Sequence, residues 1–300
     1  MLLLVPLLAL LEAAPVETPA APSEKGEARP GPAGLEVRWA RTWDEAAQAA
    51  RKIPNGRILI SFVDRDCGQC QRMDALILPS TDFFAFTRDK VPVRLSLSSP
   101  EGASLARRLR VPGVPAWYVV TPDLVICGAQ VGPTTQMGWV ETFSRAEQGW
   151  FDYKKKLEEE AGEPRNDSLV FEVARETFRR GGDQIAEPRF RRLAASSRVA
   201  LNIREQCLAY LATIEMDGSR FPEARRDLDE LLRIGKDPAI LQRAEMRRAE
   251  LVIALGRKDL AARRLRAFKQ AHPGSDLVRD ADDLLRRLGV PESANGGDSR

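Results

Sequence analysis

The sequence predicts an α/β domain followed by an all-α domain of helical repeats. Up to residue 148, β-branched apolar runs alternate with helical patterns, whereas residues 167–288 show helical patterns alone. A Cys-x-x-Cys pair follows one of the apolar runs after three polar residues. With 300 residues and 43% apolar content, the chain is long and apolar enough for two domains of about 150 residues each.

Charge and histidine content exclude several classes of function. The 46 basic and 43 acidic side chains are interleaved and leave a net charge of +3, which argues against a nucleic-acid surface or a polybasic membrane surface. The single histidine, His272, argues against a His-rich zinc site, and its His-Pro-Gly context predicts a helix end or turn.

The N-terminus has the pattern of a targeting segment. The apolar run at residues 1–11 is too short to cross a bilayer, and small residues follow it, so residues 1–21 are predicted to be a signal peptide. No Lys or Arg precedes the run, which leaves a mis-assigned start or an apolar terminus as the alternative. Export would place the chain in a compartment where disulfides persist. Contact with a membrane is expected only if the signal segment stays uncleaved. Residues 22–34, rich in Pro, Ala, Glu and Gly, are predicted to be a disordered linker.

Apolar runs and helical patterns alternate in the order βαβαβαββα. A capping-box pattern at Thr42–Glu45 opens the first helix, and Thr121–Asp123 is expected to form a hairpin turn. The predicted strands lie at residues 35–40, 57–63, 91–97 and 124–131, and residues 111–120 are predicted to be a turn that enters a further strand. This order places the Cys-x-x-Cys pair at the second junction between a strand and a helix.

Residues 35–148 resemble the thioredoxin superfamily. The resemblance is carried by Cys67-Gly68-Gln69-Cys70 at the start of a helix, by Val114-Pro115 before a strand, and by Gly132 after the last strand. The sequence that follows the cysteines resembles a subgroup with many exported bacterial thiol oxidoreductases and the carboxy-terminal domain of transmembrane disulfide reductases.

The resemblance implies catalytic roles for Cys67, Cys70 and a cis-peptide Pro115. It implies substrate contacts for Val114, Gly68 and Gln69, with the Cys67–Cys70 disulfide as the redox group and neither a cofactor nor a metal.

Elementary chemistry supports the same site. Residues at i and i+3 share a helix face, which brings two cysteines close enough for a disulfide. Unpaired N–H groups at a helix N-terminus stabilise a thiolate, so Cys67 is the predicted nucleophile and Cys70 the resolving cysteine. A cis bond before proline costs only about 0.5–1 kcal/mol, which permits one at Pro115.

Two residues depart from the family pattern. Asp66 stands where the family usually has a tryptophan before the first cysteine, and Ser61 stands where it has a buried aspartate. The negative charges of Asp66 and Asp64 oppose a thiolate at Cys67. We therefore expect a less acidic Cys67 than a strongly oxidising protein requires, and hence a reductant or thiol-maintaining role.

The residues alone leave other interpretations of the cysteines open. Cys67 and Cys70 could be a structural staple, half of a zinc site or a degenerate site, although Cys127 and Cys207 lack paired spacing. The latter two are expected to be buried core residues, with a disulfide between the domains as the alternative.

The second half of the chain repeats itself with a shift of 38 residues. Ala186 aligns with Ala224 and Ala262, and Leu193 aligns with Leu231. The pattern resembles tetratricopeptide-type helix pairs, so the predicted fold is a thioredoxin-like domain followed by tetratricopeptide-like helical repeats. Residues 149–166 are predicted to form a charged helical linker, and residues 289–300 a disordered tail.

Together these features predict an exported thiol–disulfide oxidoreductase. Its expected partners are protein thiols or disulfides, a redox partner protein, and a protein bound by the helical repeats. A non-enzymatic adaptor and a copper or zinc chaperone are the alternatives.

Overall fold

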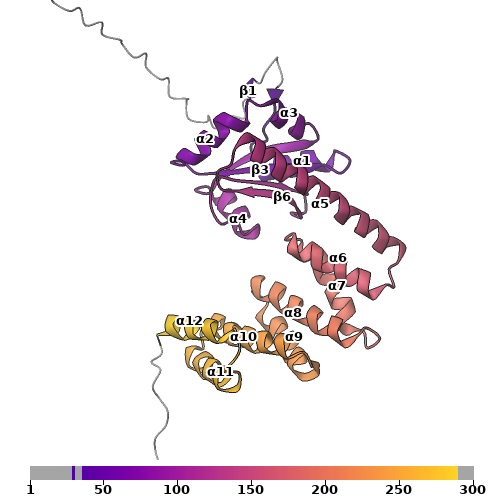
Figure 1. Ribbon diagram of the computed structural model, residues 1–300, viewed down its shortest axis with the longest axis vertical. Coiled ribbons are helices and arrows are strands. Elements are labelled where there is room, and N and C mark those ends of the chain that lie inside the picture. Colours follow the sequence, from indigo (N-terminus) through magenta and orange to yellow (C-terminus); the bar gives the residue numbers. More distant parts are fainter. Residues whose placement is uncertain (1–28, 31–35, 290–300) are drawn as a thin grey trace, which may run out of the picture.

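A mixed four-stranded sheet forms the centre of the N-terminal half (Figure 1). The computed structural model describes residues 29–30 and 36–289. β3 (Arg57–Val63) pairs in parallel with β4 (Lys90–Ser96) and antiparallel with β5 (Ala116–Val120). β6 (Ile126–Val131) pairs antiparallel with β5 and gives the order β4-β3-β5-β6. This α/β arrangement is the fold predicted from the sequence.

The first predicted strand is shorter than expected and belongs mainly to a separate pair. β1 (Arg29–Pro30) and β2 (Glu36–Val37) pair antiparallel, so two residues of the predicted disordered linker are ordered. Val37 is buried in the core, which holds β2 in place for this pairing. The predicted signal peptide (1–21), the other linker residues up to 28 and from 31 to 34, and the tail from residue 290 lie outside the described residues.

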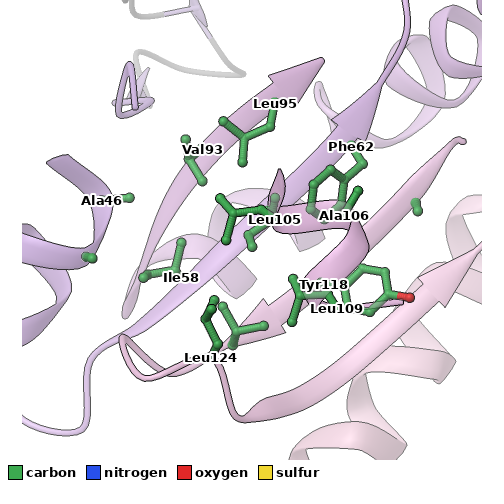
Figure 2. Packing of buried hydrophobic residues seen from close by; sticks show 14 of the residues in the cluster. Ala46, Ile58, Phe62, Val93, Leu95, Leu105, Ala106, Leu109, Tyr118 and Leu124 are labelled. Atoms are coloured by element: carbon green, nitrogen blue, oxygen red, sulfur yellow. The ribbon is translucent and has the colours of Figure 1, made fainter. Parts of the chain in front are cut away.

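One face of the sheet is covered by α1 (Trp43–Arg51) and α4 (Pro100–Arg108). Alternate residues of β3, including Ile58, Ile60 and Phe62, point toward these helices because side chains alternate across a strand. Figure 2 shows this core, in which β3 and β4 residues lie against Leu105 and Ala106 of α4.

The other face is covered by α2 (Gly68–Ile77), α3 (Thr81–Thr87) and α5 (Gln136–Gly162). Its core is rich in aromatic side chains, including Trp117, Trp139 and Phe143, which are each 1% exposed. Rings packed edge to face in this way contribute about 0.5–1.5 kcal/mol per pair beyond their buried area. The core therefore fixes α2, and with it the cysteine pair, on the sheet.

Hydroxyl side chains start several of these helices. The hydroxyls of Thr42, Ser80, Ser99 and Thr135 each accept a hydrogen bond from the backbone N–H three residues later. Such caps satisfy N–H groups that have no partner within the helix, at about 1 kcal/mol each. Half of the capping box predicted at Thr42 and Glu45 is present: Thr42 caps Glu45, whereas the Glu45 carboxylate accepts from the N–H of Arg41 and not from that of Thr42.

The second half of the chain is all helical, as predicted. Consecutive helices contact each other and bury three successive apolar cores. They are α6 (Asp167–Arg179), α7 (Asp183–Ala195), α8 (Leu201–Asp217), α9 (Phe221–Ile234), α10 (Pro238–Ala254), α11 (Lys258–Ala271) and α12 (Val278–Leu288).

The 38-residue shift matches equivalent positions in these helices. The aligned alanines of α7, α9 and α11 are at most 1% exposed and lie in three successive cores (Ala186, Ala224, Ala262). Small side chains at these positions let the paired helices approach closely. The expected spacing is thus present in the structure.

The two halves are joined by α5 and by contacts at the edge of the sheet. α5 runs without a break across residue 148 toward the helical region (Figure 1). The N–H of Ile126 on β6 donates to the carbonyl of Arg180 at 2.7 Å, in the turn between α6 and α7. At Gly182 in this turn, an added Cβ would lie 3.1 Å from Val125 and 2.8 Å from Thr177. The glycine therefore allows the turn to approach the sheet closely.

Candidate functional site

The cysteine pair lies where β3 ends and α2 begins. β3 ends at Val63, and Cys67 is the N-cap of α2. The backbone N–H of Cys70 donates to the Sγ of Cys67 at 3.0 Å. A helix N-terminus carries unpaired N–H groups and partial positive charge, so this position favours negative charge on sulfur.

Cys67 and Cys70 form a disulfide with a Cα–Cα distance of 5.2 Å. Cys70 is 4% exposed and lies in the first turn of α2, whereas Cys67 is half-buried and lines a surface cleft. An incoming thiol or disulfide therefore reaches Cys67 before it reaches Cys70.

The loop before β5 faces this pair. The peptide bond between Val114 and Pro115 is cis, as the sequence predicts. The carbonyl of Pro115 accepts a hydrogen bond from the N–H of Gly132 at 2.9 Å, and Gly132 has a φ of 81° that favours glycine. The predicted glycine thus lies beside the predicted proline.

A cleft of about 530 Å³ lies over Cys67. Four of the six predicted site residues line it. Of the other two, Cys70 is buried beneath Cys67, and Pro115 is the residue after Val114 in the sequence. The lining residues are Asp64, Arg65, Asp66, Cys67, Gly68, Gln69, Ser98 and Val114. Ser98 was not predicted from the sequence. It reaches the cleft because β3 and β4 are parallel, so the residues that follow the two strands meet at one edge of the sheet.

The charges around Cys67 have both signs. The Ser98 hydroxyl donates to Asp64, and the N–H of Arg65 also donates to it, so the pKa of Asp64 is lowered and its carboxylate stays ionised. The Arg72 guanidinium lies over the start of α2, where a Cβ added at Gly68 would be 3.8 Å from its Nη1. The negative charges of Asp64 and Asp66 are thus opposed by the positive charges of Arg65 and Arg72 around the N-terminus of α2.

Ser61 occupies the sheet face beneath α2. It is 1% exposed, and its Oγ has no hydrogen-bond partner among the described residues. Its neighbours along β3, Leu59 on the same face and Ile60 on the other, are apolar and buried. A buried hydroxyl without a partner among the described residues therefore lies on β3 beneath α2.

The remaining cysteines lie apart from this site. Cys127 on β6 and Cys207 on α8 are buried free thiols, as predicted, so the alternative of a disulfide between the domains is not present in the structure. Burial raises the pKa of each thiol to about 12. Both thiols therefore stay protonated and unreactive near neutral pH.

Further features bear on ligands and membranes. His272 ends α11, as predicted, and its Nε2 lies 3.1 Å from Glu245. In the part of the chain that the structure describes, no three His, Cys, Asp or Glu side chains are grouped as metal ligands. Within residues 29–30 and 36–289, no helix combines the length and apolarity needed to cross a bilayer.

Comparison with known proteins finds structural neighbours that cover about the N-terminal third of the chain. No family model matches the chain, and no curated protein matches it. The solution structure of a thioredoxin from Thermus thermophilus is 25% identical, with a TM-score of 0.33, and the match covers 36% of this chain and 85% of that one. The DsbH oxidoreductase is 19% identical, with a TM-score of 0.32, and the match covers 37% of this chain and 85% of that one. The fold assignment rests on the strand order and pairing described above.

Proposed function

We propose that the chain is a thiol–disulfide oxidoreductase that acts on protein thiols. The observation that carries this proposal is the Cys67–Cys70 disulfide, with one sulfur at the N-cap of α2 and in a surface cleft and the other buried beneath it. Disulfide exchange requires one accessible, stabilised thiolate and one nearby resolving thiol, and the pair supplies both.

In the reducing direction, the exchange would take two steps. The Cys67 thiolate attacks one sulfur of a substrate disulfide, which breaks that bond and releases one substrate sulfur as a thiolate. Cys70 then loses its proton and attacks the Sγ of Cys67, releasing the second substrate thiolate. Two electrons pass from the Cys67–Cys70 dithiol to the substrate, and a dithiol of a redox partner protein reduces the resulting disulfide.

The two carboxylates near Cys67 favour this reducing direction, while Arg65 and Arg72 act against them. The ionised Asp64 and the adjacent Asp66 oppose the thiolate that the helix end stabilises. A less stable Cys67 thiolate in the reduced form makes the disulfide harder to reduce. We expect a reduction potential nearer to about −270 mV than to about −120 mV, as measured against glutathione. A potential near the second value would refute the reductant role.

Catalysed reduction of insulin by dithiothreitol tests the proposed activity. We expect the wild-type chain to accelerate insulin reduction, and Cys67→Ser and Cys70→Ser each to abolish the acceleration. Cys127→Ala is the matched control, because it removes a buried thiol that lies outside the cleft. A wild-type rate equal to that of dithiothreitol alone would favour the adaptor hypothesis instead.

We also propose export and a partner-binding role for the helical repeats. Export is supported by the apolar run at residues 1–11. Mass spectrometry of the chain from an extracytoplasmic fraction should show a shortened N-terminus. An intact N-terminus with all of the protein in the cytoplasm would contradict export.

A further inference from the structure

Charged side chains gather at two junctions, where helices of neighbouring repeats meet. The two junctions occupy related positions in the repeats and carry opposite net charge. In the first, Arg191 of α7 lies among three carboxylates: Glu187 at 3.4 Å, Glu215 at 2.5 Å and Asp227 at 2.8 Å. Arg220 also donates two hydrogen bonds to Glu187, at 2.7 and 2.6 Å. This junction is closed, because both of its arginines are paired with carboxylates of the chain itself.

The second junction lies one 38-residue repeat further along, with the signs reversed. Asp229 of α9 stands at the position related to Arg191, and Arg225 at the position related to Glu187. Asp229 forms ion pairs with Arg248 of α10 at 3.1 Å and with Arg225 at 3.6 Å. We call Arg225, Asp229, Arg248 and Arg264 the arginine cluster, since Arg264 of α11 completes it.

Positive charge in the arginine cluster is not balanced. Two guanidiniums, those of Arg225 and Arg248, pair with the single carboxylate of Asp229. The Nε of Arg264 is buried without a hydrogen-bond partner among the described residues. Burial lowers the pKa of Arg264. The positive charges of Arg248 and Arg225 lower it further, and the negative charge of Asp229 raises it in part. The chain thus holds a guanidinium in an unfavourable position that an added anion would relieve.

The cluster is also open to solvent. The side chain of Arg225 is 72% exposed, that of Asp229 is 42% exposed and that of Arg248 is 28% exposed. The arginines come from three successive helices, α9, α10 and α11, so they are presented along the repeats and not within one loop.

We propose that the arginine cluster binds carboxylate side chains of an acidic segment in a partner protein. Guanidiniums bind carboxylates through charge-assisted hydrogen bonds. The carboxylate of Asp229 already lies 3.1 Å from Arg248 and 3.6 Å from Arg225, as ion pairs. The fixed negative charge of Asp229 disfavours a compact dianion such as phosphate, whereas separate single charges can pair with Arg264 and Arg225. The inference is independent of the redox chemistry, and binding is measured with the oxidised chain.

A fluorescein-labelled peptide of six glutamates with an amidated C-terminus is the probe. Its anisotropy is titrated with the full chain at about 50 mM salt, where surface charges are only partly screened. We expect the Arg248→Gln, Arg264→Gln double variant to weaken binding about tenfold, which corresponds to about 1.4 kcal/mol. The matched control is Arg247→Gln, Arg263→Gln, which removes the same charge from the same two helices and should change binding less than about twofold.

The single variant Arg264→Gln keeps the test independent of folding. Its Nε has no partner to lose, so the variant should unfold at the same temperature as the wild type or higher, while binding the peptide more weakly. Equal weakening in the double variant and its control, or no binding of the peptide to the wild type, would overturn the proposal. Displacement of the peptide by submillimolar inorganic phosphate would assign the cluster to a phosphate-bearing ligand instead.

Discussion

Arg180 connects the helical region to the α/β domain, and its replacement should separate their unfolding. Its Nη1 donates to the carbonyl of Ile126 on β6 at 3.1 Å, and its Nη2 donates to the carbonyl of Gly149 on α5 at 3.0 Å. The guanidinium also lies 5.0 Å from the ring of Tyr153. The side chain is 16% exposed, so water replaces these contacts poorly.

The expected cost of Arg180→Ala follows from these contacts. Each hydrogen bond from a charged donor contributes about 1.5 kcal/mol, which gives about 3 kcal/mol for the two carbonyls. Arg179→Ala is the matched control, because that neighbouring side chain is exposed and should change stability by less than about 0.5 kcal/mol.

The distribution of tryptophans supplies the assay. All five tryptophans lie between residues 39 and 150, whereas most helical residues lie beyond residue 150. During urea unfolding, tryptophan fluorescence therefore reports the α/β domain and circular dichroism at 222 nm reports mainly the helical region. We expect the two transitions to coincide in the wild type and to separate in Arg180→Ala. An Arg180→Ala chain as stable as Arg179→Ala would refute the role of Arg180.

Three further predictions follow from the site and its surroundings. After reduction, the native chain should present two thiols to Ellman's reagent at pH 8, and four in urea. Burial raises the pKa of Cys127 and Cys207 to about 12, so both thiols stay protonated at pH 8. Four reactive thiols in the native chain would contradict this. Ser61→Ala should change the free energy of unfolding by less than about 1 kcal/mol, since the Oγ has no partner to lose; a larger loss in urea titration would reveal a hydrogen bond that is absent from the structure. Asp66→Asn should shift the pH dependence of Cys67 alkylation by iodoacetamide to lower pH, because a negative charge next to the thiolate is removed; an unchanged profile would show that Asp66 does not act on Cys67.

Local sequence patterns predict much of the fold. Apolar β-branched runs and hydroxyl caps act over a few residues, so β3, β4 and the start of α1 are found where the sequence places them. The spacing of Cys67 and Cys70 after a strand is local too, which is why their positions at the start of α2 could be predicted. The buried states of Cys127 and Cys207 follow from the apolar segments around them.

Contacts between distant segments could not be predicted in this way. Ser98 reaches Asp64 because β3 and β4 are parallel neighbours, and no pattern near Ser98 indicates it. The pairing of Arg29 and Pro30 depends on a buried Val37, and the bonds of Arg180 depend on how α6 meets β6. The 38-residue shift aligns Arg191 with Asp229, but the charges that gather around each come from helices that only the fold brings together.

Trapping of a mixed disulfide tests the central claim that Cys67 is the attacking thiol and Cys70 the resolving one. A Cys70→Ser chain is reduced, freed of reductant and mixed with insulin, and the products are analysed by non-reducing mass spectrometry. We predict that this variant accumulates a covalent complex through Cys67, that Cys67→Ser forms none, and that the wild type releases reduced insulin. A complex formed through Cys70, or equal complex formation by both variants, would contradict the assignment.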